Sequence, residues 1–185
     1  QESPAAVKEL RLRLAEVLAE LSRREESLDA ARRAMEIEPH APGELERLQT
    51  IFTGLRAQND AVRAMELTAQ AHLAIGEQSE AIEVYFAIAE LWVGQSKPET
   101  AATALEKVLE VDPANRRAYE AIQDLYAQAN DWRSWSTNAD RYVVQLVTDE
   151  EKLELLRTLS RVQEERLHQK DTAFLTACRA LQLQP

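Results

Sequence analysis

The sequence has few of the residues that shape disulfide frameworks, tight loops and β-sheets. Among 185 residues there are one cysteine, four glycines and six prolines, and aromatic residues make up 5%. The single cysteine, Cys178, can form neither an internal disulfide nor a structural metal site that needs several thiolates. The helix formers Ala, Leu, Glu, Arg and Gln dominate, which argues against a sandwich, a barrel or a parallel sheet. The composition therefore predicts an all-α protein.

Patterns typical of catalytic and phosphate-binding sites are also missing. The four glycines form no Gly-x-Gly-x-x-Gly, phosphate-loop or Gly-x-Ser-x-Gly pattern. His40, His72 and His168 have no second histidine or cysteine at three- or four-residue spacing, so we expect no metal site. Cys178 lies among alanines and leucines, which predicts a buried structural thiol. We expect neither enzymatic activity nor a cofactor.

Long hydrophobic runs are absent, and the charge balance is acidic. The stretch 67–76 is interrupted by Gln70 and His72 and is much shorter than the roughly 18 residues of a membrane span. The 32 acidic and 22 basic side chains give a formal net charge of -10, which disfavours binding to nucleic acid or to an anionic membrane. We expect no membrane insertion. The absence of a signal-peptide pattern favours the cytoplasm, with the periplasm as the alternative.

A repeat is visible in the positions of the prolines, which mark helix boundaries because proline disrupts a helix interior. Pro39, Pro113 and Pro185 close three similar phrases, AMEIEP, VLEVDP and ALQLQP, and are separated by nearly equal intervals. Each interval is close to two repeats of about 36 residues. Twelve residues before each of these prolines lies an anchor position at the start of a helix. With two intermediate counterparts, the anchors recur at intervals of about 34–40 residues; they are Ser27, Ala61, Ala101, Trp135 and Ala173.

This spacing, with two helices in each repeat, resembles that of the tetratricopeptide repeat (TPR), whose period is about 34 residues. The resemblance is carried by large, aromatic and Leu-small positions in the first helix and by small residues in the second. Repeat by repeat, these residues are Leu14, Ala15, Leu18, Ala31 and Ala34; Leu45, Leu48, Phe52 and Met65; Tyr85, Ile88, Ala89, Trp92 and Leu105; Tyr119, Ile122 and Tyr126; and Leu156, Leu159, Ser160 and Ala177.

Three positions depart from the family pattern. Gln49 and Gln123 stand where a small residue is usual, and Trp135 occupies the tightest helix crossing of the fourth repeat. The distance between packed helices depends on the side chains at their contact. We therefore expect Trp135 to push these two helices apart or to change their angle.

The resemblance implies an all-α, right-handed α-α superhelix (solenoid) of about five TPR-like helix pairs, or ten helices, in a single array over residues 1–185. The wide spacing between the second and third anchors predicts an extended first helix in the third repeat, beginning near Glu77; a further turn and second helix over 76–81 is the alternative. The predicted repeats cover 5–41, 42–75, 76–115, 116–148 and 149–185.

Stacking of the repeats is expected from the amphipathic helices, because such helices cannot be buried alone. The final helix, 171–183, has no solvating helix after it, although a free end of an array normally needs a polar cap. We therefore expect the chain to be part of a longer array, or to self-associate through this uncapped terminus. The apolar positions that lead to these expectations are Leu10, Leu14, Val17, Leu18 and Leu21 in the first helix, and Leu175, Leu181 and Leu183 in the last.

In TPR proteins the first helices line a concave face that commonly holds an extended peptide or a helix, and the resemblance implies such a face here. Leu12 and Glu16 replace the Lys and Asn of the carboxylate clamp found in chaperone-binding members, so we do not expect recognition of chaperone tails. By register, the candidate partner-binding residues are Arg13, Glu16, Arg47, Thr50, Phe86, Glu90, Arg117, Glu120, Asp124, Arg157 and Arg161.

Three features refine the expected ligand. Arg117, Arg157 and Arg161 would suit an acidic peptide or a C-terminal carboxylate, and a solvated charged face is the alternative. The segment 76–115 contains eight acidic and two basic residues, which either aid solubility or dock a basic partner. Phe86 falls on the concave register and is expected to be an exposed aromatic anchor.

The leading hypothesis is a scaffold or adaptor module that binds a protein partner on its concave face. One alternative is a structural array that assembles by end-to-end stacking or dimerisation. Another is a regulatory region of a larger enzyme.

Overall fold

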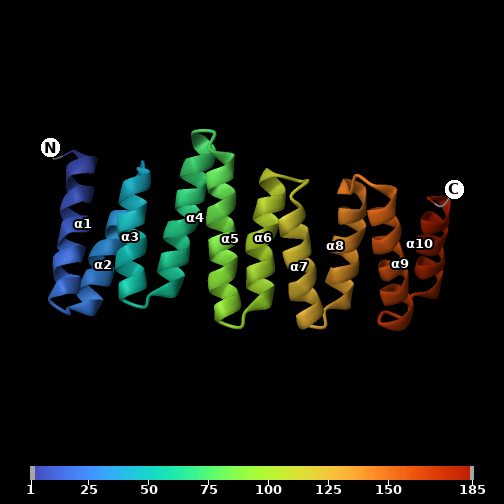
Figure 1. Cartoon of the computed structure of the whole chain (residues 1–185). Coiled ribbons are helices and arrows are strands. Elements are labelled where there is room, and N and C mark those ends of the chain that lie inside the picture. The colour runs from blue at the N-terminus through green and yellow to red at the C-terminus, as the bar shows by residue number, and fades with distance from the viewer. Residues whose placement is uncertain (1–2, 184–185) are drawn as a thin grey trace. The chain divides into compact units, whose positions relative to one another are not determined.

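The computed structural model describes residues 3–183 and shows ten α-helices and no strand in that part of the chain (Figure 1). The prediction of an all-α array of ten paired helices is confirmed. The helices are α1 (Pro4–Glu20), α2 (Arg24–Met35), α3 (Pro42–Gly54), α4 (Gln58–Ala74), α5 (Gln78–Gly94), α6 (Pro98–Val111), α7 (Arg116–Gln128), α8 (Trp132–Gln145), α9 (Asp149–Glu165) and α10 (Lys170–Gln182).

The chain divides into two compact units, Gln1–Ile88 and Ala89–Pro185. They are termed the N-terminal unit and the C-terminal unit, and each is described by itself. The single array over 1–185, with its five repeat boundaries, stays a prediction.

One turn geometry recurs five times along the chain. The turn inside each helix pair contains one non-glycine residue with a left-handed φ between 56° and 60°, a conformation that commonly ends helices. Each of these residues precedes an anchor of the sequence by the same offset, so the turns recur with the spacing of the anchors. The residues are Ser22, Arg56, Ser96, Asn130 and His168.

Side-chain caps and prolines fix where several helices begin. Asn115 accepts a hydrogen bond from the backbone N–H of Ala118 at 3.0 Å, and Asp131 accepts one from that of Ser134 at 3.1 Å. Such caps satisfy N–H groups that have no partner inside the helix. Pro98 stands in the first turn of α6, where the missing N–H costs nothing.

The extended helix predicted for the third repeat is present. Helix α5 has 17 residues and begins at Gln78, one residue after the predicted start. Helix α4 also has 17 residues, whereas α2 has 12. The wide spacing between the second and third anchors is therefore shared between α4 and α5.

The core of the N-terminal unit is apolar and tightly packed. Leu12, Leu45, Leu48 and Phe52 are fully buried. Ser27 is fully buried as well, and its hydroxyl donates to the carbonyl oxygen of Ala15 at 2.7 Å. This small side chain sits at the contact of α1 and α2 and satisfies its own hydroxyl there.

The first helix buries a different face from the one that the sequence predicts. Of the five apolar residues expected to pack, only Leu18 is buried. Helix α1 instead turns Lys8, Leu12 and Ala15 toward the core. Since both faces of α1 are apolar, the hydrophobic period did not determine which one packs. The four expected residues that remain exposed are Leu10, Leu14, Val17 and Leu21.

In the C-terminal unit, α8 contacts both α7 and α9. Trp135 is buried with Ala139 and Leu159, and the rings of Tyr119 and Tyr142 stack with their centroids 4.7 Å apart. The separation or changed angle expected at the Trp135 crossing stays a prediction.

The last helix shows the exposed apolar residues that the sequence predicts. Leu175 and Leu181 are exposed, and Leu183 packs partly against a small core cluster. Cys178 is half-buried, so the prediction of a fully buried thiol is wrong.

Candidate protein-binding cleft

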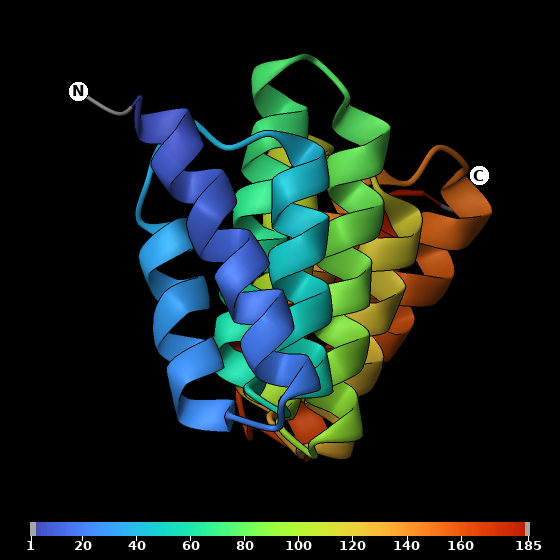
Figure 2. The ribbon, with the colours of Figure 1, turned by 90° about the vertical axis from the view of Figure 1, so that its left-hand side faces the viewer.

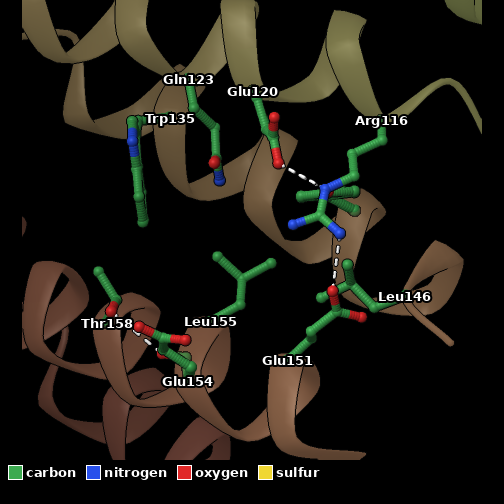
Figure 3. Close-up of a pocket in the computed structure, with 10 residues that line it drawn as sticks. Arg116, Glu120, Gln123, Trp135, Leu146, Glu151, Glu154, Leu155 and Thr158 are labelled. Atoms are coloured by element: carbon green, nitrogen blue, oxygen red, sulfur yellow. Dashed lines mark hydrogen bonds and ion pairs between the residues drawn. The ribbon is translucent and has the colours of Figure 1, made fainter. Parts of the chain in front are cut away.

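A cleft of about 340 Å³ lies in the C-terminal unit between α7, α8 and α9 (Figure 3). It is termed the α7–α9 cleft. Its lining residues are Arg116, Glu120 and Gln123 from α7; Trp135, Tyr142 and Leu146 from α8 and its C-terminal end; and Glu151, Glu154, Leu155 and Thr158 from α9.

Arg116 bridges the two outer helices at one end of the cleft. Its Nε lies 2.7 Å from Oε1 of Glu120, and its Nη1 lies 2.7 Å from Oε1 of Glu151 (Figure 3). Hydrogen bonds from Arg116 and then from Thr148 hold the pKa of Glu151 below its ordinary value. Arg116 thus has carboxylates of its own chain as partners.

The rest of the lining makes the cleft acidic. Glu154 is exposed and forms no ion pair with any residue between 3 and 183. The hydroxyl of Thr158 donates to the backbone oxygen of Glu154 at 3.0 Å and leaves that carboxylate free. The lining contains one arginine and three glutamates. The cleft therefore carries a formal charge of about -2 at neutral pH.

A buried amide nitrogen without a partner lies in the same cleft. The Nε2 atom of Gln123 is shielded from solvent and has no hydrogen-bond partner among the described residues. Its side chain projects into the cleft beside Trp135 (Figure 3). Buried polar atoms are nearly always hydrogen-bonded, and one left unpaired costs free energy. An acceptor from a ligand would remove this cost.

The structure places the predicted residues of the C-terminal unit at separate positions. Glu120 lines the cleft, whereas the guanidinium in the cleft comes from Arg116 rather than Arg117. Arg157 lines another pocket, of about 270 Å³, between α9 and α10. Arg161 is exposed and lines neither pocket. The three predicted arginines therefore do not form one site in these pockets.

Two further candidates in this unit, Asp124 and Glu90, are exposed and lie outside the cleft lining. Sequence reasoning missed Arg116, Glu151 and Glu154 as lining residues. The substitution of Gln123 for the usual small residue was the available signal for the unpaired amide.

In the N-terminal unit, three predicted residues meet in one ion-pair network. Nε of Arg47 lies 2.7 Å from Oε1 of Glu16, and its Nη1 lies 2.7 Å from Oε2 of Glu9. Nε of Arg13 also contacts Glu9, at 2.7 Å. Hydrogen bonds from Arg47 and then Arg13 lower the pKa of Glu9. These two arginines and two glutamates, termed the α1–α3 network, neutralise one another.

The remaining two candidates of this unit lie outside the network. The hydroxyl of Thr50 donates to the backbone oxygen of Glu46 at 2.9 Å. Phe86 is only 6% exposed, and its neighbour Tyr85 is also buried. The expectation that Phe86 is an exposed aromatic anchor is wrong, because α5 buries both of these rings.

Neither a membrane span nor a metal cluster is found among residues 3–183. No helix in this range is long and apolar enough to cross a membrane. No group of three or more His, Cys, Asp or Glu side chains in the same range could hold a metal ion.

No protein-family model and no curated protein matches the chain. Similar solved structures include the MamA protein, with 11% identity, a TM-score of 0.44, and coverage of 97% of this chain and 92% of that one. YrrB, described as a TPR protein with an unusual peptide-binding site, has 13% identity, a TM-score of 0.40, and coverage of 95% and 85%. BtubC from P. vanneervenii has 15% identity, a TM-score of 0.44, and coverage of 98% and 82%.

The paired helices and the turn that recurs at the anchor spacing are features of this chain itself. They make it an all-α protein of helix pairs that recur along the described residues.

Proposed function

We propose that this protein is a non-catalytic interaction module that holds an extended polypeptide segment with a basic side chain in the α7–α9 cleft. The observation that carries this proposal is the buried, unpaired amide of Gln123 inside an acidic cleft. Scaffold or adaptor activity would follow from holding such a segment.

The amide of Gln123 favours a ligand with a peptide backbone. Its N–H groups need an acceptor, and an extended peptide offers a carbonyl oxygen at every residue. Because solvent does not reach this donor in the structure, the hydrogen bond requires the amide of Gln123 to turn toward the cleft as the ligand binds. Trp135 and Leu155 line the same cleft, and they offer apolar surface to the ligand.

The charge of the cleft favours a basic side chain on that ligand. Arg116 is already paired with Glu120 and Glu151, whereas Glu154 is free of ion pairs with described residues. A lysine or arginine of the ligand can form a charge-assisted hydrogen bond with this carboxylate. These contacts favour a basic segment over the acidic peptide expected from Arg117, Arg157 and Arg161.

Fluorescence anisotropy with labelled decapeptide pools tests this proposal. One pool has lysine or arginine fixed at a single position, the second has glutamate there, and the third has glutamine. We expect the basic pool to bind most tightly and to weaken as salt is raised from about 50 to about 500 mM, because salt screens exposed charge pairs.

Two variants and one matched control locate the binding. Glu154→Gln should weaken binding of the basic pool about fivefold, within the range of an exposed charge pair. Gln123→Ala should weaken all pools about tenfold by removing the backbone contact. Glu46→Gln alters an equally exposed glutamate of α3 and should change nothing. If instead the acidic pool binds most tightly, and the double variant Arg157→Glu/Arg161→Glu abolishes that binding, the result would support the predicted arginines as the binding site.

A further inference from the structure

Four large apolar side chains form a continuous exposed stripe on α1 and its C-cap residue, Leu21. Leu10 is 59% exposed, Leu14 52%, Val17 51% and Leu21 63%. Their spacings of four, three and four residues place them on one face of the helix, as at the a and d positions of a coiled coil. This face is termed the outer stripe.

The outer stripe is separate from the face by which α1 packs. Lys8, Leu12 and Ala15 are buried on that other face. Figure 2 shows α1, in dark blue, at the front of the N-terminal unit. Among the described residues, no other helix has four large apolar side chains exposed. Contiguous exposed apolar surface of this kind marks an interaction site.

We propose that the outer stripe pairs with the outer stripe of a second copy of this chain, with the two α1 helices antiparallel. The stripe is self-complementary about its midpoint, which lies between residues 15 and 16. Leu10 and Leu21 are equally far from this midpoint on opposite sides, and so are Leu14 and Val17. A two-fold axis at that midpoint places Leu10 against the partner's Leu21, and Leu14 against the partner's Val17. Such an isologous contact closes as a dimer.

Charged residues beside the stripe favour this orientation. Arg13 and Glu20 are exposed and lie on the same side of the stripe. Arg13 contacts Glu9 of its own chain through Nε alone, and a guanidinium has two further amino groups that can bind a second carboxylate. In the antiparallel register, Arg13 is offset by two residues, about 3 Å along the axis, from the partner's Glu20. The two-fold axis forms this pair twice. Flanking charges of this kind set orientation in paired helices.

A parallel register lacks these pairs. Arg13 would face the partner's Leu18, which is buried, and Glu20 would face residues beyond the end of α1. Antiparallel helix dipoles are also the more favourable arrangement. Although the whole chain carries -10, residues 4–20 contain three basic and three acidic side chains, so copies meeting at α1 face little net repulsion.

Sedimentation equilibrium across a concentration series measures the association. We expect a reversible monomer–dimer equilibrium for the chain and a monomer for Leu14→Glu. Leu181→Glu changes a side chain of α10 that is 65% exposed and should still dimerise. Circular dichroism should show unchanged helicity in both variants. The proposal would be overturned if the wild type were a monomer at all concentrations or formed assemblies larger than a dimer. It would also be overturned if Leu14→Glu and Leu181→Glu weakened association equally.

Charge exchange and a distance measurement test the orientation. Arg13→Glu and Glu20→Arg should each weaken dimerisation at least threefold, and the double variant should regain most of it. A spin label at Ala6→Cys, with Cys178→Ser, should report about 30 Å between labels for antiparallel helices, against about 10 Å for parallel ones. Failure of the double variant to recover, or a short distance, would refute the antiparallel pairing.

Discussion

In each of the two units an arginine bridges the first helices of two successive helix pairs, and yet the surfaces around the two bridges differ in charge. Arg47 joins α3 to α1 through Glu16, and Arg116 joins α7 to α9 through Glu151. In the N-terminal unit, two arginines meet two glutamates and the charges cancel. In the C-terminal unit, one arginine pairs with two of the three glutamates that line the cleft, and Glu154 remains free of ion pairs with described residues. The balance of side chains around the bridge, rather than the bridge itself, therefore sets the net charge of each surface.

The helix crossings differ in the same two units. Ser27 lies at the contact of α1 and α2, fills little space and bonds its hydroxyl to Ala15. Trp135 lies at the corresponding anchor of α8 and lines the α7–α9 cleft together with Gln123. A large anchor therefore accompanies the open cleft, and a small anchor accompanies the closed pair.

Replacing the large anchor should have the largest effect. We expect Trp135→Ala to lower the free energy of unfolding by about 3–5 kcal/mol, since it removes a buried aromatic side chain and leaves a cavity. Urea denaturation followed by far-UV circular dichroism measures this loss. Trp132→Ala is the control, because Trp132 is half-buried and packs under Arg166 at 5.0 Å. If Trp135→Ala and Trp132→Ala lower the free energy of unfolding equally, the anchor position contributes no more to stability than another tryptophan of α8.

The second prediction concerns a buried charge of the N-terminal unit that has no counterpart among the described residues of the C-terminal unit. Lys8 is 2% exposed, and its ammonium donates to the backbone oxygen of Pro39 and, at 2.7 Å, to Glu44. Lys8→Ala should lower the free energy of unfolding by about 2 kcal/mol, because it leaves buried acceptors unpaired.

Lys152 of the C-terminal unit provides the matched control. Its contact with Asp149 is 3.6 Å long and partly exposed. Lys152→Ala should therefore change the free energy of unfolding by less than about 0.5 kcal/mol. If both lysine variants lose the same amount, burial of the ion pair does not distinguish the units.

The number of helices could be predicted from the sequence, and so could the start of α5 and the bounds of α10, each to within one residue, because prolines and anchor residues mark boundaries locally. The recurring left-handed turns could not be predicted from the sequence. They use residues such as Arg56 and Ser96, and only glycine gives a clear signal for a positive φ. Helix α1 shows a second limit, since Leu12 and Leu14 lie on two apolar faces of which only tertiary packing selects one.

The cleft was harder to predict than the fold. Neighbouring residues on a helix differ by about 100° in direction, so a register set by family resemblance selected Arg117 where Arg116 lines the cleft. Gln123 was visible in the sequence as a departure from the repeat. Its lack of a partner became apparent only once the surrounding side chains were placed.

The smallest expected effect is a difference between the two units in how their stability depends on pH. Burial, and then the charge of Lys8, hold the pKa of His40 below its ordinary 6.5, although Glu38 and Glu44 oppose the shift. The unfolded chain therefore takes up a proton below about pH 6.5 that the folded N-terminal unit takes up only at lower pH. Linkage then requires stability to fall as the pH drops through this window. The pKa of Glu151 is lowered from 4.5, so its stabilisation is lost only in more acidic solution.

Urea midpoints at pH 7 and pH 5.5 measure this difference. We expect a lower midpoint at pH 5.5 for the wild type and a smaller change for His40→Gln, which cannot titrate. His168→Gln replaces an exposed histidine of the C-terminal unit and should behave as the wild type does. If His40→Gln keeps the full pH dependence, the loss must arise from other titrating groups, and His40 would no longer distinguish the acid sensitivity of the N-terminal unit from that of the C-terminal one.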